Sequence, residues 1–135
     1  MPRVLTYGTF DLFHWGHVRL LQRARSLGSQ LFVGLSTDNF NAIKGKQSLF
    51  TFEQRVEILE SCRYVSQVFA ETQWDQKISD ITKYGIDIFV MGDDWVGKFD
   101  HLSSYCDVVY LERTPDISST LVKSIARDTL PAGRA

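Results

Sequence analysis

Two histidines lie three residues apart where an apolar run gives way to a helical pattern. The apolar residues 4–7 end at Gly8, and the segment TFDLFHWGH, which contains His14 and His17, follows. The free N–H groups and the dipole of a helix N-terminus favour anions, and two imidazoles there could donate to phosphate oxygens. Two other interpretations stay open. One histidine could cap the helix while the other packs, or the pair could bind a metal, although zinc needs a third ligand that no neighbouring residue supplies.

A second group of phosphate-binding residue types follows the last apolar run, at residues 108–111. The sequence RTPDISST there spans residues 113–120 and leads into a further helical pattern. Arg113 offers a planar guanidinium suited to phosphate, and Ser118, Ser119 and Thr120 supply hydroxyl groups at a helix N-terminus. A plain N-cap explains one hydroxyl, but it does not explain an arginine beside several hydroxyl residues. We therefore expect a second anion-binding element here.

The elements that must position these groups alternate between strands and helices. We expect strands at residues 4–7, 31–35, 65–69, 86–91 and 108–111, and helices at 17–27, 51–61, 75–84, 99–105 and 118–127. This alternation predicts a parallel sheet with right-handed crossovers, and continuous apolar runs indicate strands that are covered on both faces. The predicted fold is a Rossmann-like three-layer α/β sandwich with a five-stranded parallel sheet. Ligands bind such sheets beyond the C-terminal strand ends, where the strand order switches.

Individual residues mark several of the predicted helix ends. Thr51 followed by Gln54 resembles a capping box at the start of the second helix, and Asp75 is expected to cap the third. Gly28 and Gly85 are expected to end the first and third helices, because glycine readily adopts the left-handed conformation of a C-cap.

Bulk properties limit the class of protein. The chain has 135 residues, which suits one domain at residues 1–129 with a flexible tail at 130–135. A net charge of -1 gives no bulk attraction to nucleic acid or to an anionic membrane. Cys62 and Cys106 lie far apart without a CxxC partner, which disfavours a zinc site. No apolar stretch approaches the roughly 20 residues of a membrane span, so we expect a soluble, cytoplasmic protein.

Both chemistry-bearing segments match motifs of one family. GTFDLFHWGH resembles the HxGH motif of the cytidylyltransferase superfamily, and RTPDISST resembles its second, RTxGISTT-type motif. MGDDW at residues 91–95 and Lys44-Gly45-Lys46 resemble the branch of that superfamily that acts on glycerol 3-phosphate. The resemblance implies a nucleotidyltransferase that converts CTP and sn-glycerol 3-phosphate into CDP-glycerol and pyrophosphate. The expected step is direct in-line attack on the α-phosphate.

The resemblance also implies roles for the matching residues. Nucleotide binding falls to Thr9, Phe10, His14, His17, Lys46, Asp94, Arg113, Thr114, Ile117, Ser118, Ser119 and Thr120. Catalysis falls to His14, His17, Lys44 and Arg113, and binding of the acceptor falls to Lys44, Arg55, Arg63 and Lys77. Asp94 would accept a hydrogen bond from the cytosine amino group. Asp11 would either orient a histidine or contact Mg²⁺, the cofactor that accompanies CTP.

Alternatives to this interpretation remain open. ATP could replace CTP, the acceptor could be another phosphorylated alcohol or a sugar phosphate, or the chain could be a nucleotide-binding module without catalysis. The sequence shows no obvious aromatic cage for a quaternary ammonium, which disfavours phosphocholine, and Trp74 either covers the acceptor or simply packs. Pro115-Asp116 stands where the family has Glu-Gly, which leaves the conformation of that loop open. The resemblance further implies a homodimer and a product used for teichoic acid or another cell-surface polymer.

Overall fold

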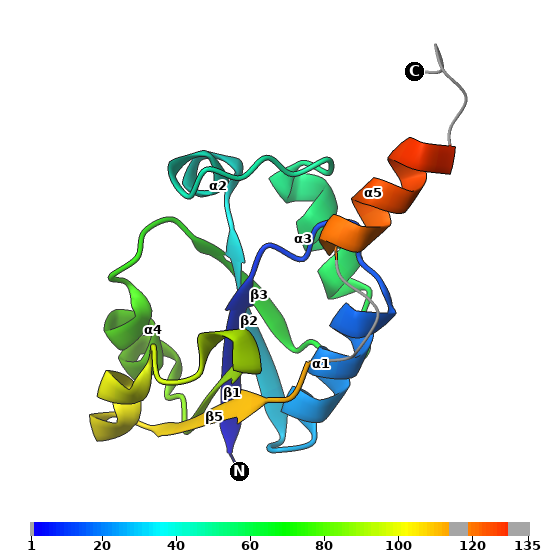
Figure 1. Cartoon of the computed structure of the whole chain (residues 1–135). Coiled ribbons are helices and arrows are strands. Elements are labelled where there is room, and N and C mark those ends of the chain that lie inside the picture. The colour runs from blue at the N-terminus through cyan, green and yellow to red at the C-terminus, as the bar shows by residue number, and fades with distance from the viewer. Residues whose placement is uncertain (1, 114–118, 130–135) are drawn as a thin grey trace.

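The computed structural model describes residues 2–113 and 119–129, and at positions 119 and 127–129 it describes the backbone but not the side chains. Its strands are β1 (Arg3–Gly8), β2 (Gln30–Ser36), β3 (Gln67–Glu71), β4 (Ile88–Gly92) and β5 (Asp107–Leu111). They form a 5-stranded sheet in the order β3-β2-β1-β4-β5, and every pairing is parallel. The predicted five-stranded parallel sheet is therefore confirmed. Its strand order switches between β1 and β4 (Figure 1).

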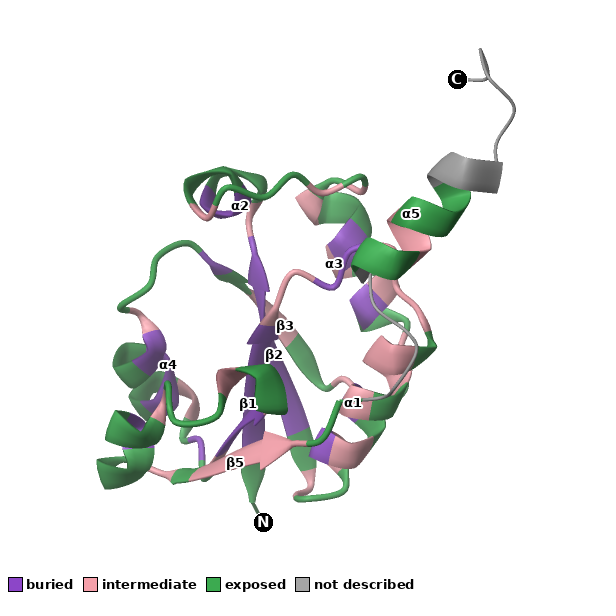
Figure 2. Ribbon diagram, in the orientation of Figure 1, coloured by how far each residue is buried: buried purple, intermediate pink, exposed green. Residues whose placement is uncertain are grey.

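Helices cover both faces of this sheet, which gives the predicted three-layer sandwich. The helices are α1 (Trp15–Arg25), α2 (Asp38–Ile43), α3 (Phe52–Glu60), α4 (Lys77–Tyr84) and α5 (Ser119–Thr129), with 3₁₀ helices η1 (Asp93–Trp95) and η2 (Asp100–Ser104). In Figure 1, α1, α3 and α5 lie on one side of the sheet and α4 lies on the other. The central strands β1, β2 and β4 are largely buried, whereas the edge strands β3 and β5 are mostly intermediate or exposed, as the pink ribbon of β5 in Figure 2 shows.

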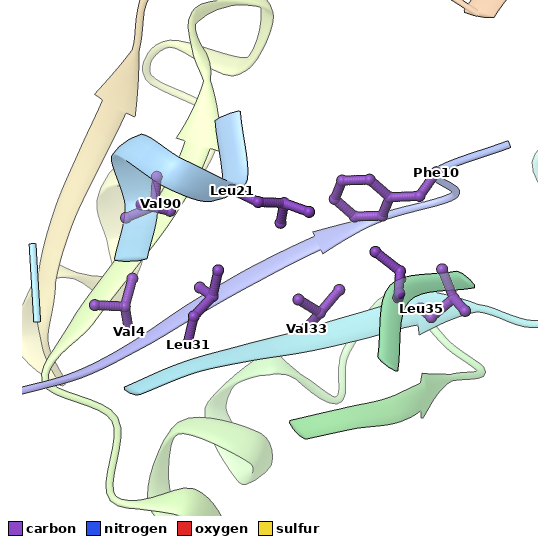
Figure 3. Packing of buried hydrophobic residues seen from close by; sticks show 9 residues of the cluster. Val4, Phe10, Leu21, Leu31, Val33, Leu35 and Val90 are labelled. Atoms are coloured by element: carbon purple, nitrogen blue, oxygen red, sulfur yellow. The ribbon is translucent and has the colours of Figure 1, made fainter. Parts of the chain in front are cut away.

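Alternate residues of each strand supply two hydrophobic cores. Val4, Leu31 and Val33 pack with Leu21 of α1, and Figure 3 shows these side chains in one cluster. The neighbouring residues on the same strands point the other way, so that Leu5 and Phe32 pack with Phe89 and with Ile81 of α4. Because successive side chains of a strand face opposite sides, each continuous apolar run fills both cores at once.

Several predicted boundaries are confirmed and others are wrong. The Thr51–Gln54 capping box is present, and Gly85 ends α4 with a left-handed φ of 61°. Asp75 does not cap α4, because the N-cap is Gln76 and it makes no side-chain capping bond. Gly28 does not end α1, whose C-cap is Ser26. The Gly28 position instead faces the backbone, since an added Cβ would lie 2.5 Å from the Pro2 carbonyl oxygen.

The remaining differences concern short elements. The third strand begins at Gln67 rather than at residue 65, and the fourth begins at Ile88 rather than at residue 86. The expected helix at 99–105 is the 3₁₀ helix η2. Sequence periodicity did not predict α2, which has only 6 residues and is too short to show a helical repeat. Thr37 caps this helix by accepting a hydrogen bond from the Phe40 N–H. The sequence therefore contains an N-cap residue for α2, but no helical repeat of apolar residues follows it.

Candidate active site

A sharp turn after β1 places both histidines at the start of α1. The turn uses two non-glycine residues with positive φ, Phe10 at 50° and Leu12 at 52°. Such backbone costs energy and persists where surrounding contacts fix it, often at functional sites. Phe10 is buried in the core beside α1, and its ring lies edge-on to His17 at a centroid distance of 5.1 Å. The buried Phe10 ring therefore fixes the strained turn against the core.

The two histidines form the capping box of α1. The Nδ1 atom of His14 accepts the Gly16 N–H at 3.0 Å, and the Nδ1 atom of His17 accepts the His14 N–H at 3.2 Å. The rings stack at a centroid distance of 3.8 Å. A nitrogen that accepts a hydrogen bond carries no proton, so each neutral ring holds its proton on Nε2. The alternative interpretation, in which one histidine caps and the other packs, is replaced by a geometry in which both cap through Nδ1.

Burial keeps these rings neutral. It lowers the pKa of His17 to about 3, with a further contribution from the neighbouring His14 and a small opposing effect from Asp11. Burial also lowers the pKa of His14. Among the described residues, the Nε2 atom of His14 is buried without a hydrogen-bond partner. A buried donor left without a partner costs about 1–3 kcal/mol, so this N–H is suited to a ligand oxygen.

The histidines line a cavity of about 260 Å³ at the switch in strand order, here called the histidine cavity. It lies beyond the C-terminal ends of β1 and β4, as predicted for open parallel sheets. Its predicted lining residues are Thr9, Phe10, His14, His17, Asp94 and Arg113. Asp94 and Arg113 are exposed at its mouth, with 3.9 Å between Oδ2 and Nη1. Trp95 and Leu20 also line the cavity, and no site role was predicted for them because aromatic and aliphatic residues carry no signal of their own for a binding site.

A second cavity of about 340 Å³, the lysine cavity, contains Lys44, Lys46 and Lys77. It shares Tyr7, Gly8, Thr9, Met91 and Trp95 with the histidine cavity, so the two cavities meet. The Lys44 ammonium donates to the Ser36 hydroxyl at 2.7 Å. Burial lowers the pKa of Lys44, and the Glu71 carboxylate acts in the opposite direction.

Aromatic residues surround the third lysine of this cavity, which the sequence did not suggest. The Lys77 ammonium lies 4.7 Å from the ring centroid of Tyr7, 5.5 Å from that of Phe99 and 6.0 Å from that of Trp74. The sequence shows no obvious aromatic cage for a quaternary ammonium, and the rings that the fold gathers enclose the chain's own ammonium. Tyr7, Trp74 and Phe99 lie far apart in sequence, and only the fold brings them together. Trp74 also packs edge-on against Phe40, so it both packs and covers the cavity.

Arg55 lies beneath the site and is fully buried. Its guanidinium donates to the carbonyl oxygens of Thr9, Ser36 and Phe50 and to the Asp38 carboxylate at 2.8 Å. These bonds join the turn after β1 to the end of β2. The arginine lines none of the described cavities around the histidines and lysines. The geometry does not support direct binding of an acceptor phosphate and instead makes Arg55 a positioning residue.

Arg63 lies away from the cavities. It follows α3 and precedes β3, whereas the cavities lie beyond the opposite ends of the strands. Its guanidinium donates to the neighbouring Tyr64 hydroxyl at 2.9 Å and lies over the same ring. Within the described chain, the structure does not bring this predicted acceptor-binding residue to the site.

Asp11 is the anchor of a neighbouring loop. Its carboxylate accepts the N–H groups of Leu49 and Phe50 at 2.8 and 3.1 Å and the Lys123 ammonium of α5 at 2.8 Å. Burial acts to raise the pKa of Asp11, but the bonds from Lys123 and from the two backbone groups outweigh it, so the pKa is lowered. A carboxylate engaged in this way does not suit a direct contact with Mg²⁺. In the part of the chain that the structure describes, no three His, Cys, Asp or Glu side chains gather to hold a metal.

The second motif is described only in part. Thr114, Ile117 and Ser118 lie outside the described residues, and the same holds for the side chain of Ser119. Thr120 lines a third cavity of about 390 Å³ together with His17, Lys46 and Lys123. The start of α5 and the start of α1 therefore face a common space, as the two motifs predicted. Among the described residues, no helix has the length and hydropathy to cross a membrane.

Comparison with known proteins places the chain in a family. Residues 5–125 match the family described as cytidylyltransferase-like. The glycerol-3-phosphate cytidylyltransferase of Bacillus spizizenii is 58% identical over 123 residues, which cover 91% of this chain and 95% of the relative. The enzyme of that name from Staphylococcus aureus is 54% identical, over 91% of this chain and 93% of its own. The chain therefore belongs to the cytidylyltransferase-like family.

A solved structure shares the same fold. The crystal structure of the lipopolysaccharide core biosynthesis protein from Thermoplasma volcanium superposes with a TM-score of 0.73. The match covers 84% of this chain and 98% of that one, at 23% sequence identity. At this identity the likeness concerns the Rossmann-like fold and not the activity.

Proposed function

We propose that the protein is a glycerol-3-phosphate cytidylyltransferase, which converts CTP and sn-glycerol 3-phosphate into CDP-glycerol and pyrophosphate. The observation that carries this proposal is the meeting of two cavities, one lined by neutral histidine donors and the other by lysines. A reaction between two phosphorylated substrates requires such a pair of adjoining sites. The relatives of 58% and 54% identity bear the name of this activity.

The reaction needs alignment and charge stabilisation more than proton removal. A phosphate monoester has a second pKa of about 6 and is largely a dianion at neutral pH. Its oxygen attacks the α-phosphorus of CTP in line, a new P–O bond forms, and the bond to pyrophosphate breaks. With a pKa of about 3, His17 is too weak a base to contribute much as a proton acceptor. We assign the Nε2–H groups of His14 and His17 to the phosphate oxygens on which negative charge increases.

The exposed groups at the mouth of the histidine cavity suit the nucleotide. Arg113 offers two parallel N–H donors to a phosphate. Asp94 offers an acceptor for the cytosine amino group. Thr9 and Phe10 form the floor of the same cavity. Thr114, Ile117, Ser118 and Ser119 stay predicted nucleotide-binding residues, as does Thr120 at the third cavity.

The lysine cavity suits the acceptor. Lys46 is exposed and Lys44 is half-buried, and both line a space that opens onto the histidine cavity. The Lys44 ammonium would hold the acceptor phosphate opposite the leaving pyrophosphate, and Lys46, which also lines the third cavity with His17 and Thr120, stays a predicted nucleotide-binding residue. Arg55 would act indirectly, since its bonds to the Thr9 and Ser36 carbonyls fix the backbone between the two cavities.

We propose that the nucleotide, rather than the protein, supplies the ligands of magnesium. The described residues offer no group of three metal-binding side chains, and Asp11 is already bonded to Lys123 and to backbone N–H groups. These residues do not form a resident Mg²⁺ site. We propose that Mg²⁺ enters bound to the triphosphate of CTP, and we assign no catalytic step to it.

The test is a pyrophosphate-release screen of the purified protein with Mg²⁺. CTP and ATP are each paired with glycerol 3-phosphate, phosphocholine, phosphoethanolamine and a sugar 1-phosphate. We expect the highest kcat/KM with CTP and glycerol 3-phosphate. If another acceptor wins by more than about tenfold, or about 1.4 kcal/mol in transition-state binding, the glycerol assignment is wrong. If no pair releases pyrophosphate, the rival hypothesis of a non-catalytic nucleotide-binding module is favoured.

The family resemblance also supports proposals on context. We propose that the enzyme is a cytoplasmic homodimer whose product supplies teichoic acid or another cell-surface polymer. Light scattering of the purified protein tests the dimer, because a monomer would have a mass near the 15.5 kDa of one chain.

A further inference from the structure

The Lys77 ammonium occupies the position that a bound organic cation would take in an aromatic cage. The rings of Tyr7, Phe99 and Trp74 lie at 4.7, 5.5 and 6.0 Å from its nitrogen. Cations are held over aromatic faces at distances of up to about 6 Å, which is how quaternary ammonium ligands are recognised. The rings come from β1, from the segment before η2 and from the segment before α4. The cage is therefore a product of the tertiary fold.

A carboxylate completes the surroundings of this lysine. Glu71 Oε2 lies 3.2 Å from the Lys77 nitrogen, and the two side chains are only 5% and 7% exposed. The other oxygen of Glu71 accepts the Ser36 hydroxyl at 3.0 Å, and Ser36 also accepts a hydrogen bond from Lys44. The carboxylate is thus fixed in place and does not depend on Lys77 alone for its position.

We infer that Lys77 is a specificity-determining residue that fills this cage with the enzyme's own cation and so excludes acceptors that carry a quaternary ammonium. The inference rests on the proposed function, since it concerns the acceptor side of the same reaction. A trimethylammonium group would have to enter a space that the Lys77 side chain already occupies. It would also have to displace a buried ion pair.

The same pair favours an uncharged polyol. The Lys77 ammonium has three protons, so it can bond Glu71 and still donate to an alcohol oxygen. Glu71 can accept from an alcohol O–H in return. A glycerol group with two hydroxyls therefore meets a donor and an acceptor side by side. A choline group has no hydroxyl left once it is phosphorylated, and it can use neither.

The experiment compares Lys77→Ala with Lys77→Met. Alanine removes as many heavy atoms beyond Cβ as a trimethylammonium group contains, and it leaves the rings and Glu71 in place. Methionine removes the charge but keeps an apolar chain inside the cage. We measure kcat/KM for phosphocholine and for glycerol 3-phosphate at saturating CTP in both variants and in the wild type. The KM for CTP serves as the control for an intact histidine cavity.

We expect Lys77→Ala to raise the ratio of phosphocholine to glycerol 3-phosphate turnover by about tenfold or more, because the emptied cage can hold a cation. Lys77→Met should leave the use of phosphocholine close to that of the wild type. If both acceptors lose activity in parallel in Lys77→Ala, the lysine binds a phosphate common to both, and the inference is overturned. An equal gain in Lys77→Met also overturns it, because charge rather than occupancy would then decide.

A binding measurement keeps the inference testable if the alanine variant is unstable or if the proposed reaction itself is wrong. Tetramethylammonium chloride should raise the melting temperature of Lys77→Ala relative to sodium chloride at the same ionic strength, and it should leave that of the wild type unchanged. Equal melting temperatures in the two salts would overturn the cage, whatever the reaction. Failure of the wild type to use glycerol 3-phosphate would instead overturn the proposed function and leave the cage to this measurement.

Discussion

The two cavities of the site meet at Trp95, but their polar groups are built in opposite ways. The histidine cavity presents neutral N–H donors whose other ring nitrogens are bonded to the backbone of α1. The lysine cavity presents ammonium groups, and Lys44 and Lys77 are each bonded to a hydroxyl or a carboxylate. The histidine cavity holds uncharged histidine donors in its interior and charged groups such as Asp94 and Arg113 at its exposed mouth, whereas the lysine cavity holds cations that are partly balanced.

This difference matches the two kinds of anion that the reaction handles. Negative charge on the reacting phosphate increases during the step, and fixed N–H donors can stabilise that increase. Because these donors are neutral, they do not attract a carboxylate of the protein before the substrate binds. The acceptor phosphate carries its full charge before the step begins, so resident cations suit it. A cation that is buried and unbalanced would be costly, which explains why Ser36 and Glu71 lie beneath these lysines.

The largest effect is expected from His17→Ala, which removes a donor from the neutral side. Losing one preorganised donor to a developing oxyanion typically costs about 2.7–4 kcal/mol, or roughly 100–1000-fold in kcat. His17→Gln is the matched control, because its carbonyl oxygen can still accept the His14 N–H and keep the capping box. We expect both variants to lose turnover, and alanine alone to lose about 0.5–2 kcal/mol of stability as well. A folded alanine variant with near-normal kcat would contradict the donor role.

The next largest effect is expected from Arg55→Met, beneath the two cavities, and it concerns the stability of the fold. Methionine keeps an apolar stem but leaves the carbonyl oxygens of Thr9 and Ser36 without their donor. Each buried group without a partner costs about 1–3 kcal/mol, so for two carbonyls we expect a loss of roughly 2–6 kcal/mol in the free energy of unfolding. Urea denaturation measures it. If stability were unchanged while KM for the acceptor rose, Arg55 would bind substrate directly, as the family resemblance implied.

Arg55 also shows where prediction from sequence ends. The strands, the parallel sheet and the place of both motifs followed from apolar patterns and local capping residues, because these signals act over a few positions. The burial of Arg55 depends on carbonyl groups from the turn after β1, from β2 and from the segment before α3. A basic residue has the same appearance in a sequence whether it binds a ligand or its own backbone.

The aromatic cage could not be predicted from the sequence for a related reason. Tyr7, Trp74 and Phe99 were each visible in the sequence, but only Trp74 was considered as a possible cover for the acceptor, with ordinary packing as its alternative. Their meeting around Lys77 requires the strand order and the position of α4 to be known first. Local motifs therefore located the groups that we propose to act on the phosphates, whereas the groups that we propose to select the acceptor depended on contacts between distant parts of the chain.

A smaller effect is expected from Arg113→Lys at the exposed mouth of the histidine cavity. The side chain of Arg113 is 55% exposed, so stability should not change. A lysine keeps the charge but cannot make two parallel contacts, and we expect kcat/KM for CTP to fall by about tenfold, or 1.4 kcal/mol. Equal values for the two proteins would mean that Arg113 acts as a point charge or lies outside the site.

The smallest effect concerns Asp11, which lines the third cavity and anchors the neighbouring loop. Asp11 lies in the turn that carries the histidines, and it holds the backbone of Leu49 and Phe50 and the Lys123 ammonium. Lys123→Met removes one of these bonds, and Lys98→Met, at an exposed lysine, is the control. We expect a loss of about 1 kcal/mol in the free energy of unfolding at pH 7, because Lys123 is partly exposed and solvent weakens the pair.

The lowered pKa of Asp11 determines how the stability difference between the wild type and Lys123→Met should change with pH. The folded pKa of Asp11 lies below its ordinary value of 3.8, so the bonds to its carboxylate stabilise the fold fully above that value. This stability is lost as the pH falls through the folded pKa, because a protonated carboxyl attracts Lys123 far less. The gap between the wild type and Lys123→Met should therefore stay constant from pH 7 to about pH 5 and narrow below pH 3.8. Urea denaturation at pH 7, 5 and 3 measures it, and a gap that widens in acid would show that Lys123 stabilises the fold by a route other than Asp11.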